Sequence, residues 1–89
     1  MKILKLTGQF KKDLKRYKHR QDKINALETI LGYLAKEEEV PSIYKPHPLT
    51  GNYKGFMECH VENDLLLIWL DPNTDEITLV RFGTHSELF

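Results

Sequence analysis

The feature that most constrains this chain is a run of six apolar residues, Leu65–Leu70, set between two turn sequences. Glu62-Asn63 precedes the run, and a segment of Asp, Pro, Asn and Thr, residues 71–75, follows it. Six residues suit a strand and fall far short of the roughly 20 that a membrane-spanning helix needs. A strand without polar residues is typical of a position covered on both faces. The run therefore predicts a buried central strand and no membrane span.

Residues 56–61 are expected to form the strand before this run. Their alternation places Cys59 on the core face, and Glu58 and His60 on the opposite face. Cys59 is the only cysteine, so it can form no internal disulfide, and we interpret it as a buried, unreactive thiol. A single free thiol, together with the lack of an apolar leader, favours the reducing cytoplasm.

Residues 77–82 are expected to form the last strand, with Arg81 on the same face as Leu79. An arginine among apolar neighbours can be the ion-pair partner of a carboxylate, and Glu58 is one candidate. Residues 83–89 would then form a short tail.

The N-terminal part predicts a strand followed by a helical hairpin. Residues 2–6 mix aliphatic residues with lysines, as edge strands do, and Thr7 can cap the helix that follows. Residues 10–17 carry an apolar stripe at helical spacing. A second stripe, which Asp22 can cap, continues to about Lys36.

A stretch rich in proline and glycine, residues 40–55, separates the helices from the later strands. Its three prolines and two glycines exceed what a helix or a central strand tolerates, so a loop is expected. A loop of this length favours a functional role. The element order β-α-α-β-β-β predicts an α+β fold, with a helical hairpin packed on a small, mostly antiparallel four-stranded sheet. Eighty-nine residues leave room for one domain, residues 1–89.

The formal net charge is zero, but the charge is unevenly distributed. Residues 1–23 hold nine Lys or Arg and two Asp or Glu, a net of +7, and the remaining residues carry −7. Clustered positive charge attracts phosphates, so an RNA partner is one interpretation and a solvated helix face is the other. The residues expected to contact RNA are Lys11, Lys12, Lys15, Arg16 and Lys18.

Three of the four histidines lie outside the predicted helices: His47, His60 and His85. No Cys-x-x-Cys, His-Glu-x-x-His or similar spacing is present, so neither a metal nor another cofactor is expected. Histidine can accept or donate a proton near neutral pH, and Arg81 can stabilise a charged phosphorane. These residue types suit metal-independent RNA cleavage, in which a base activates the 2′-hydroxyl and an acid protonates the leaving 5′-oxygen. Each histidine could equally be an ordinary surface residue.

Three blocks of the sequence resemble the YafQ branch of the RelE/ParE toxin superfamily. They are Tyr44–Gly55, Glu58–Asp64 and Arg81–Phe89, and Gly8–Asp13 is similar as well. The resemblance implies a RelE-like toxin domain that cleaves mRNA in the ribosomal decoding site, as part of a bacterial type II toxin–antitoxin module. It also implies a cognate antitoxin, the ribosome and mRNA as partners, and a toxin–antitoxin complex that binds operator DNA.

The resemblance also implies roles for individual residues. His47 or His60 would act as the base and His85 as the acid, while Asp64 would orient a neighbouring histidine and Arg81 would stabilise the phosphorane. Phe89 would pack against the site or stack on a base, and closing the core is its alternative role. Glu58 stands where relatives carry aspartate, and Asn63 where they carry proline. The supporting residues are Glu58, Lys54 and Phe89.

Two other functions remain open from the sequence. One is a ParE-like toxin that binds a topoisomerase without cutting, and the other is an inactive homologue acting as a binding module. An inhibitor that works by contact alone needs no set of titratable groups around one face, so the histidines favour the nuclease.

Overall fold

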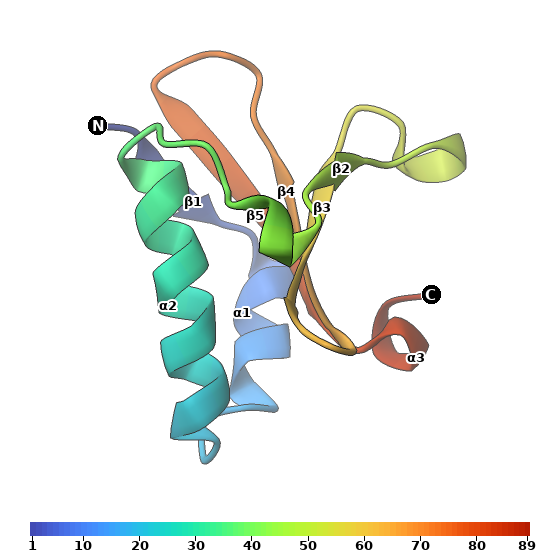
Figure 1. Ribbon diagram of the computed structural model, residues 1–89. Coiled ribbons are helices and arrows are strands. Elements are labelled where there is room, and N and C mark those ends of the chain that lie inside the picture. The colour runs from blue at the N-terminus through green and yellow to red at the C-terminus, as the bar shows by residue number, and fades with distance from the viewer.

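The apolar run forms strand β4 (Leu65–Leu70), the middle strand of a sheet with the order β1-β5-β4-β3-β2. The computed structural model describes residues 1–89 (Figure 1). β4 pairs antiparallel with β3 (Met57–Glu62) on one side and with β5 (Glu76–Gly83) on the other. The side chains from Leu65 to Trp69 are at most 4% exposed. The prediction of a central strand buried on both faces is therefore confirmed.

Helices α1 (Gly8–Lys15) and α2 (Gln21–Ala35) form the predicted hairpin. The Thr7 hydroxyl accepts a hydrogen bond from the first turn of α1, which confirms its predicted capping role. The predicted cap of α2 is wrong, because Arg20 occupies that position and Asp22 lies inside the first turn. A carboxylate in the first turn is still favourable, since it faces the positive end of the helix dipole. No helix has both the length and the apolar character needed to cross a bilayer.

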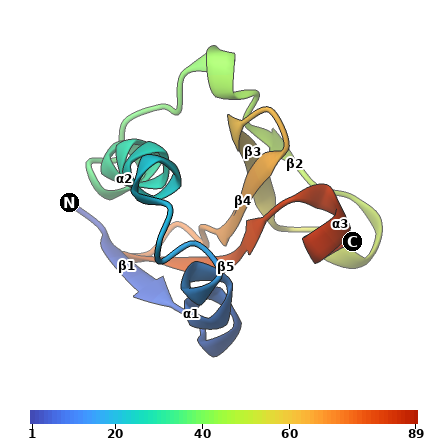
Figure 2. The ribbon, with the colours of Figure 1, turned by 90° about the horizontal axis from the view of Figure 1, so that it is seen from below.

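The sheet separates two apolar clusters. The larger one lies between the helical hairpin and one face of the sheet, and it includes Ile30 of α2 and Leu67 of β4. The smaller one lies on the other face, where Leu88 of α3 (His85–Leu88) contacts the cluster that contains Leu66. Figure 2 shows α2 and α3 on opposite sides of the sheet. The second face is where the candidate site forms.

The sheet has five strands where four were expected. β1 (Ile3–Leu6) pairs in parallel with β5, and all other pairings are antiparallel. The additional strand is β2 (His47–Pro48), in which two residues of the predicted loop pair with Glu58 and Met57 of β3. Proline has no N–H to donate, and an edge strand tolerates it. The rest of residues 40–55 is loop with two short 3-10 turns, Ser42–Tyr44 and Gly51–Tyr53.

The end of β5 does not alternate as predicted. Leu79 and Arg81 pair with adjacent residues of β4, so Val80 is an extra residue that forms a β-bulge. The Thr7 hydroxyl lies 3.1 Å from the carbonyl oxygen of Leu79 and 3.3 Å from that of Val80. The bulge places Phe82 on the core face with Leu79, and Arg81 on the opposite face. The expected grouping of Arg81 with Leu79 is wrong, because a strict alternation assumes a strand without bulges.

Candidate active site

Three histidines that are far apart in the sequence meet on the second face of the sheet. His47 comes from β2, His60 from β3, and His85 is the first residue of α3. The ring centres of His47 and His60 are 6.3 Å apart, and those of His60 and His85 are 6.1 Å apart. The three rings form a row, which we call the histidine row. The structure thus brings together the three histidines singled out in the sequence.

Asp64 holds His85 at one end of the row. It lies in the turn between β3 and β4, and its Oδ1 accepts hydrogen bonds from His85 Nδ1 (2.7 Å) and the His85 backbone N–H (3.2 Å). Both bonds lower the pKa of the Asp64 carboxyl, and the bond from the His85 ring has the larger effect. An ionised carboxylate only accepts, so Nδ1 of His85 carries a proton. Nε2 is therefore the nitrogen of His85 that is free to exchange a proton with a substrate.

His60, in the middle of the row, has its Nδ1 3.2 Å from the carbonyl oxygen of Asn63. A carbonyl oxygen cannot donate, so Nδ1 must carry the proton in this contact as well. Nε2 of the neutral ring then holds a lone pair. This arrangement suits His60 to accept a proton.

His47 differs, because both of its ring nitrogens face acceptors. Nδ1 lies 2.7 Å from the carbonyl oxygen of Lys45, and Nε2 lies 3.1 Å from Oε1 of Glu58. Nδ1 must donate to the carbonyl, so a hydrogen bond between Nε2 and Glu58 requires a proton on one of those two groups. The Glu58 side chain is only 6% exposed. The hydrogen bond between His47 and Glu58 thus exists only when one of the two groups carries that proton.

Arg81 is bound to Asp13 of α1, and the expected pairing with Glu58 is wrong. Arg81 Nε donates to Asp13 Oδ2 at 2.9 Å, and Nη2 donates to Oδ1 at 3.3 Å. The Phe82 backbone N–H also donates to Oδ2, at 3.0 Å. The ion pair raises the pKa of Arg81, mainly through the hydrogen bond to Asp13. Burial would raise the pKa of Asp13, but hydrogen bonds from Arg81, Phe82 and Gln9 hold it below its usual value.

Asp13 is a residue that sequence reasoning missed. Its side chain is fully buried at the edge of β5, beyond the end of β1. There the carboxylate accepts from a strand N–H that has no β1 residue opposite it. The one signal in the sequence is that Asp13 is the only acidic residue before Asp22 in an otherwise basic segment.

Phe89 lies beside the histidine row and does not close the core. Its side chain is 57% exposed, and its ring centre is 6.1 Å from that of His85 and 5.4 Å from that of Tyr53, which it meets edge-on. Leu88, which is 5% exposed, is the residue that packs into the apolar cluster. Lys54 follows Tyr53 and is exposed, and its side chain makes no hydrogen bond or ion pair. An exposed aromatic ring next to titratable groups can stack on a base.

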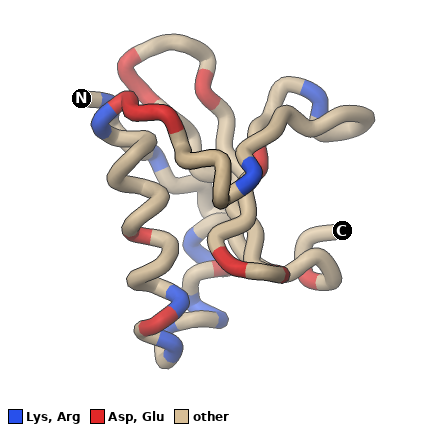
Figure 3. The backbone as a smooth tube through the Cα atoms, in the orientation of Figure 1, with Lys and Arg blue, Asp and Glu red and all other residues tan.

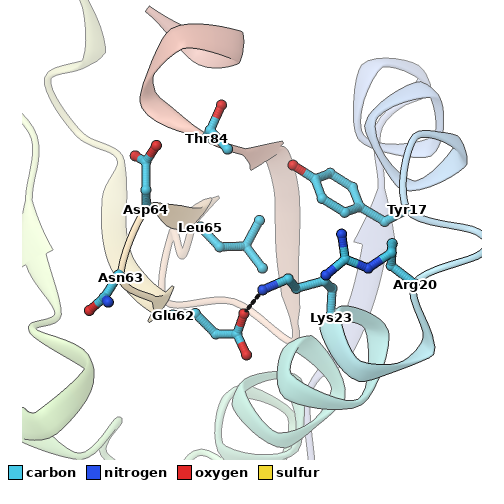
Figure 4. Close-up of a pocket in the computed structure, with 8 residues that line it drawn as sticks. All are labelled: Tyr17, Arg20, Lys23, Glu62, Asn63, Asp64, Leu65 and Thr84. Atoms are coloured by element: carbon cyan, nitrogen blue, oxygen red, sulfur yellow. Dashed lines mark hydrogen bonds and ion pairs between the residues drawn. The ribbon is translucent and has the colours of Figure 1, made fainter.

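A hollow of about 710 Å³ opens beside Asp64 (Figure 4). It lies between the turn that leads into α2 and the turn between β3 and β4. Lys23 forms an ion pair with Glu62 in this hollow, and Arg20 pairs with Asp22. These two cations adjoin the site, and no sequence pattern distinguishes them from the other basic residues of the N-terminal segment. The lining residues are Tyr17, Arg20, Lys23, Glu62, Asn63, Asp64, Leu65 and Thr84.

The predicted RNA-binding residues form an exposed basic face on α1 and the turn after it. Figure 3 shows Lys and Arg gathered there, while the acidic residues after α2 lie at the far end of that helix. Arg16 also lies 3.7 Å from Asp13 and 3.9 Å from Glu87. The basic face, whose members are all exposed, consists of Lys11, Lys12, Lys15, Arg16 and Lys18.

Comparison with known proteins identifies the family. A sequence model described as "Bacterial toxin of type II toxin-antitoxin system, YafQ" matches residues 2–89. The chain belongs to the YafQ toxin family. The resemblance of its sequence blocks to YafQ is thereby confirmed, and so is the expected α+β, RelE-like fold, with one strand more than expected.

Relatives in the YafQ family match over nearly the whole chain. The mRNA interferase toxin YafQ of Escherichia coli (strain K12) is 36% identical over 88 residues, which cover 97% of this chain and 94% of the relative. The matching chain in the crystal structure of the E. coli DinJ–YafQ complex is 33% identical, with a TM-score of 0.88 and coverage of 100% of this chain and 99% of that one. A metal-bound toxin from Helicobacter pylori is 39% identical, with a TM-score of 0.88 and full coverage of both chains.

The metal in the H. pylori relative raises the question of whether this chain could hold one. Each carboxylate beside the histidine row contacts one histidine: Glu58 contacts His47, and Asp64 contacts His85. No group of three or more His, Cys, Asp or Glu side chains is gathered as a bound metal ion would require. As they are placed, these side chains form no set of three metal ligands, and no step of the proposed reaction uses a metal.

Proposed function

We propose that this chain is a ribosome-dependent mRNA endonuclease that acts by general acid–base catalysis. The observation that carries the proposal is the histidine row, in which the neighbouring rings of His60 and His85 each have Nδ1 bound to an acceptor and Nε2 free. Its membership of the YafQ family, whose E. coli relative is named an mRNA interferase, supports the same activity. A toxin that only binds a topoisomerase would have no use for such a row.

The proposed reaction is attack of a 2′-hydroxyl on the adjacent phosphate. Nε2 of His60 accepts the 2′-hydroxyl proton while the 2′-oxygen bonds to phosphorus. His85, which enters the step with a proton on both ring nitrogens, gives the Nε2 proton to the 5′-oxygen as the bond between that oxygen and phosphorus breaks, and Asp64 accepts from Nδ1 and holds the ring in place. The products are a 2′,3′-cyclic phosphate and a free 5′-hydroxyl. Arg81 offsets the charge on the phosphorane.

The proposed partners follow from the charge distribution. The basic face of α1 would bind phosphates of ribosomal RNA and leave the histidine row turned toward the mRNA. Phe89 would stack on a base of that mRNA. A substrate held on translating ribosomes makes the cytoplasm the proposed place of action.

We also propose that an antitoxin neutralises the chain, as the DinJ–YafQ complex of E. coli indicates for that relative. An acidic segment of the antitoxin would fold onto the basic face and compete there with ribosomal RNA. The complex would in turn bind operator DNA.

Primer extension on mRNA from a translation reaction tests this function. The wild-type chain should produce discrete cuts that need translating ribosomes, and His85→Ala should produce none. His19→Ala is the matched control, because His19 is exposed in the turn after α1, and it should cut like the wild type. Growth arrest without any cut, together with inhibition of a topoisomerase, would instead establish the ParE-like alternative.

A further inference from the structure

Helix α3 is very short, yet it places two side chains of the candidate site. It has four residues, and His85 begins it while Phe89 follows it. Leu88 anchors the helix in the smaller apolar cluster. Asp64, which is itself exposed, accepts two hydrogen bonds from His85 on the open side of the helix, so a second fixed point on the buried side is needed to hold that arrangement.

Glu87 supplies that second point. Its Oε1 accepts the Thr84 backbone N–H at 2.8 Å, and its own N–H donates to the Thr84 hydroxyl, which forms a capping box. The same Oε1 accepts a hydrogen bond from the Tyr17 hydroxyl at 2.6 Å. The space beside this oxygen is tight, since a Cβ at Gly83 would lie 2.7 Å from it. Glycine at position 83 therefore leaves the room that this carboxylate occupies.

Tyr17 brings this contact from the other end of the sequence. It lies in the turn after α1, its side chain is 9% exposed, and its ring packs on Phe82 with 5.0 Å between the ring centres. Burial raises the pKa of Tyr17 to about 12, and the hydrogen bond to Glu87 is the second cause of this rise. The same hydrogen bond lowers the pKa of Glu87. A phenol that keeps its proton and a carboxylate that stays ionised form a strong, charge-assisted hydrogen bond. Arg16, 3.9 Å from the other carboxylate oxygen, adds a weaker contact.

We propose that Tyr17 is a positioning residue of the nuclease, which acts through Glu87 to fix α3 and thereby the place of His85 beside Asp64. The proposal rests on the proposed function for its effect on cleavage. Its geometric part, the orientation of the His85 ring, stands apart from activity. Tyr17 contacts no histidine of the row, and in the proposed role it does not contact the RNA.

The test compares variants that remove or keep this one hydrogen bond. Tyr17→Phe keeps the ring on Phe82 and loses the hydroxyl. The single-turnover cleavage rate at saturating toxin should fall by about tenfold to a hundredfold, the ratio that one hydrogen bond to a charged group supplies. The toxin concentration at half-saturation should not change, because the basic face is intact. Tyr33→Phe is the matched control, because the Tyr33 hydroxyl makes no hydrogen bond, and it should cut like the wild type.

Glu87 variants cover the case in which Tyr17→Phe folds poorly. Glu87→Ala should lose activity as Tyr17→Phe does, and the double variant should lose no more than either single one. Glu87→Gln keeps an oxygen that can accept from both Tyr17 and Thr84, and it should recover most of the rate.

Nitrogen NMR of the histidine side chains measures which ring nitrogen carries a proton, and so tests the geometry without an activity assay. In Tyr17→Phe and Glu87→Ala, the His85 ring should lose the signature of a proton fixed on Nδ1, while His47, which is held by Lys45 and Glu58, should keep its own. A wild-type rate in Tyr17→Phe would overturn the proposal, and so would unchanged His85 signals. If the wild-type chain cuts no mRNA, the proposed function fails, and the NMR comparison still decides whether Tyr17 orients His85.

Discussion

Replacement of Asp13 by asparagine tests the ion pair that holds Arg81. Asparagine has the same shape, but it offers one acceptor oxygen and turns an NH2 group toward the donors of Arg81 or the Phe82 N–H. Breaking a buried ion pair by removing one partner costs about 3–5 kcal/mol. Arg81 keeps 20% of its side-chain surface exposed, so water can partly solvate it, and we expect the lower value, about 3 kcal/mol.

Thermal and urea unfolding followed by circular dichroism measure this loss. A domain of this size loses roughly 4–8 °C in Tm per kcal/mol, so Asp13→Asn should unfold roughly 10–25 °C below the wild type. The matched control is Asp22→Asn, because Asp22 and its partner Arg20 are both exposed. Its Tm should fall by no more than a few degrees, since an exposed carboxylate in the first turn of a helix interacts only weakly with the helix dipole. A Tm for Asp13→Asn within error of the control would refute the reasoning.

The pH dependence of stability tests the same ion pair, because the direction of that dependence follows from the lowered pKa of Asp13. The pKa of Asp13 is lower in the folded chain than in the unfolded one. Its contribution is therefore complete above the unfolded value, about 3.9, and is lost as the pH falls through the lower folded value. The difference in unfolding free energy between wild type and Asp13→Asn should be constant near neutral pH and should shrink in acid. A difference that grows as the pH falls below about 4 would contradict this assignment.

Three further predictions concern the reaction and its partners. His60→Ala and His85→Ala should each lower cleavage by about 10²–10⁴-fold with unchanged circular dichroism, and toxicity of either variant at wild-type expression would exclude an acid–base role. Cleavage by pre-formed, crosslinked ribosome complexes should survive EDTA, because the site gathers no metal ligand set, and its loss under these conditions would point to a metal. The double variant Lys11→Glu, Lys15→Glu should weaken ribosome binding, with a shallower salt dependence, and antitoxin binding together. Unchanged antitoxin affinity would show that the two partners use separate surfaces.

Much of the fold could be predicted because it follows from local chemistry. The apolar run became β4 with the expected bounds, and Thr7 caps α1 because its hydroxyl reaches the first turn whatever the rest of the chain does. The extra strand β2 could not be predicted, since two residues around a proline carry no alternation, and they form a strand only because β3 offers an edge. The bulge at Val80 has no sequence pattern of its own either.

The candidate site, like the fold, could be predicted from the sequence only in part. The sequence pointed to the three histidines and Asp64 by residue type and by resemblance, and their roles stay a prediction. Asp13 and Tyr17 escaped notice because each acts on a partner 68 or 70 residues away. In the sequence, one looks like an isolated acid and the other like a member of an apolar stripe. Only the packing of α1 against the end of β5 gives them their partners.

The bulge at Val80 also bears on how β5 can vary in length. Within a regular strand, loss of one residue turns every later side chain to the opposite face. Deleting Val80 would instead join Leu79 directly to Arg81, and the pairs that both residues make with β4 would be preserved. The losses would be the bend that the extra residue gives the strand before α3, the contact of its carbonyl oxygen with Thr7, and its packing on the smaller apolar cluster. An alignment of natural sequences should therefore tolerate a one-residue gap in β5 at this position and nowhere else in that strand.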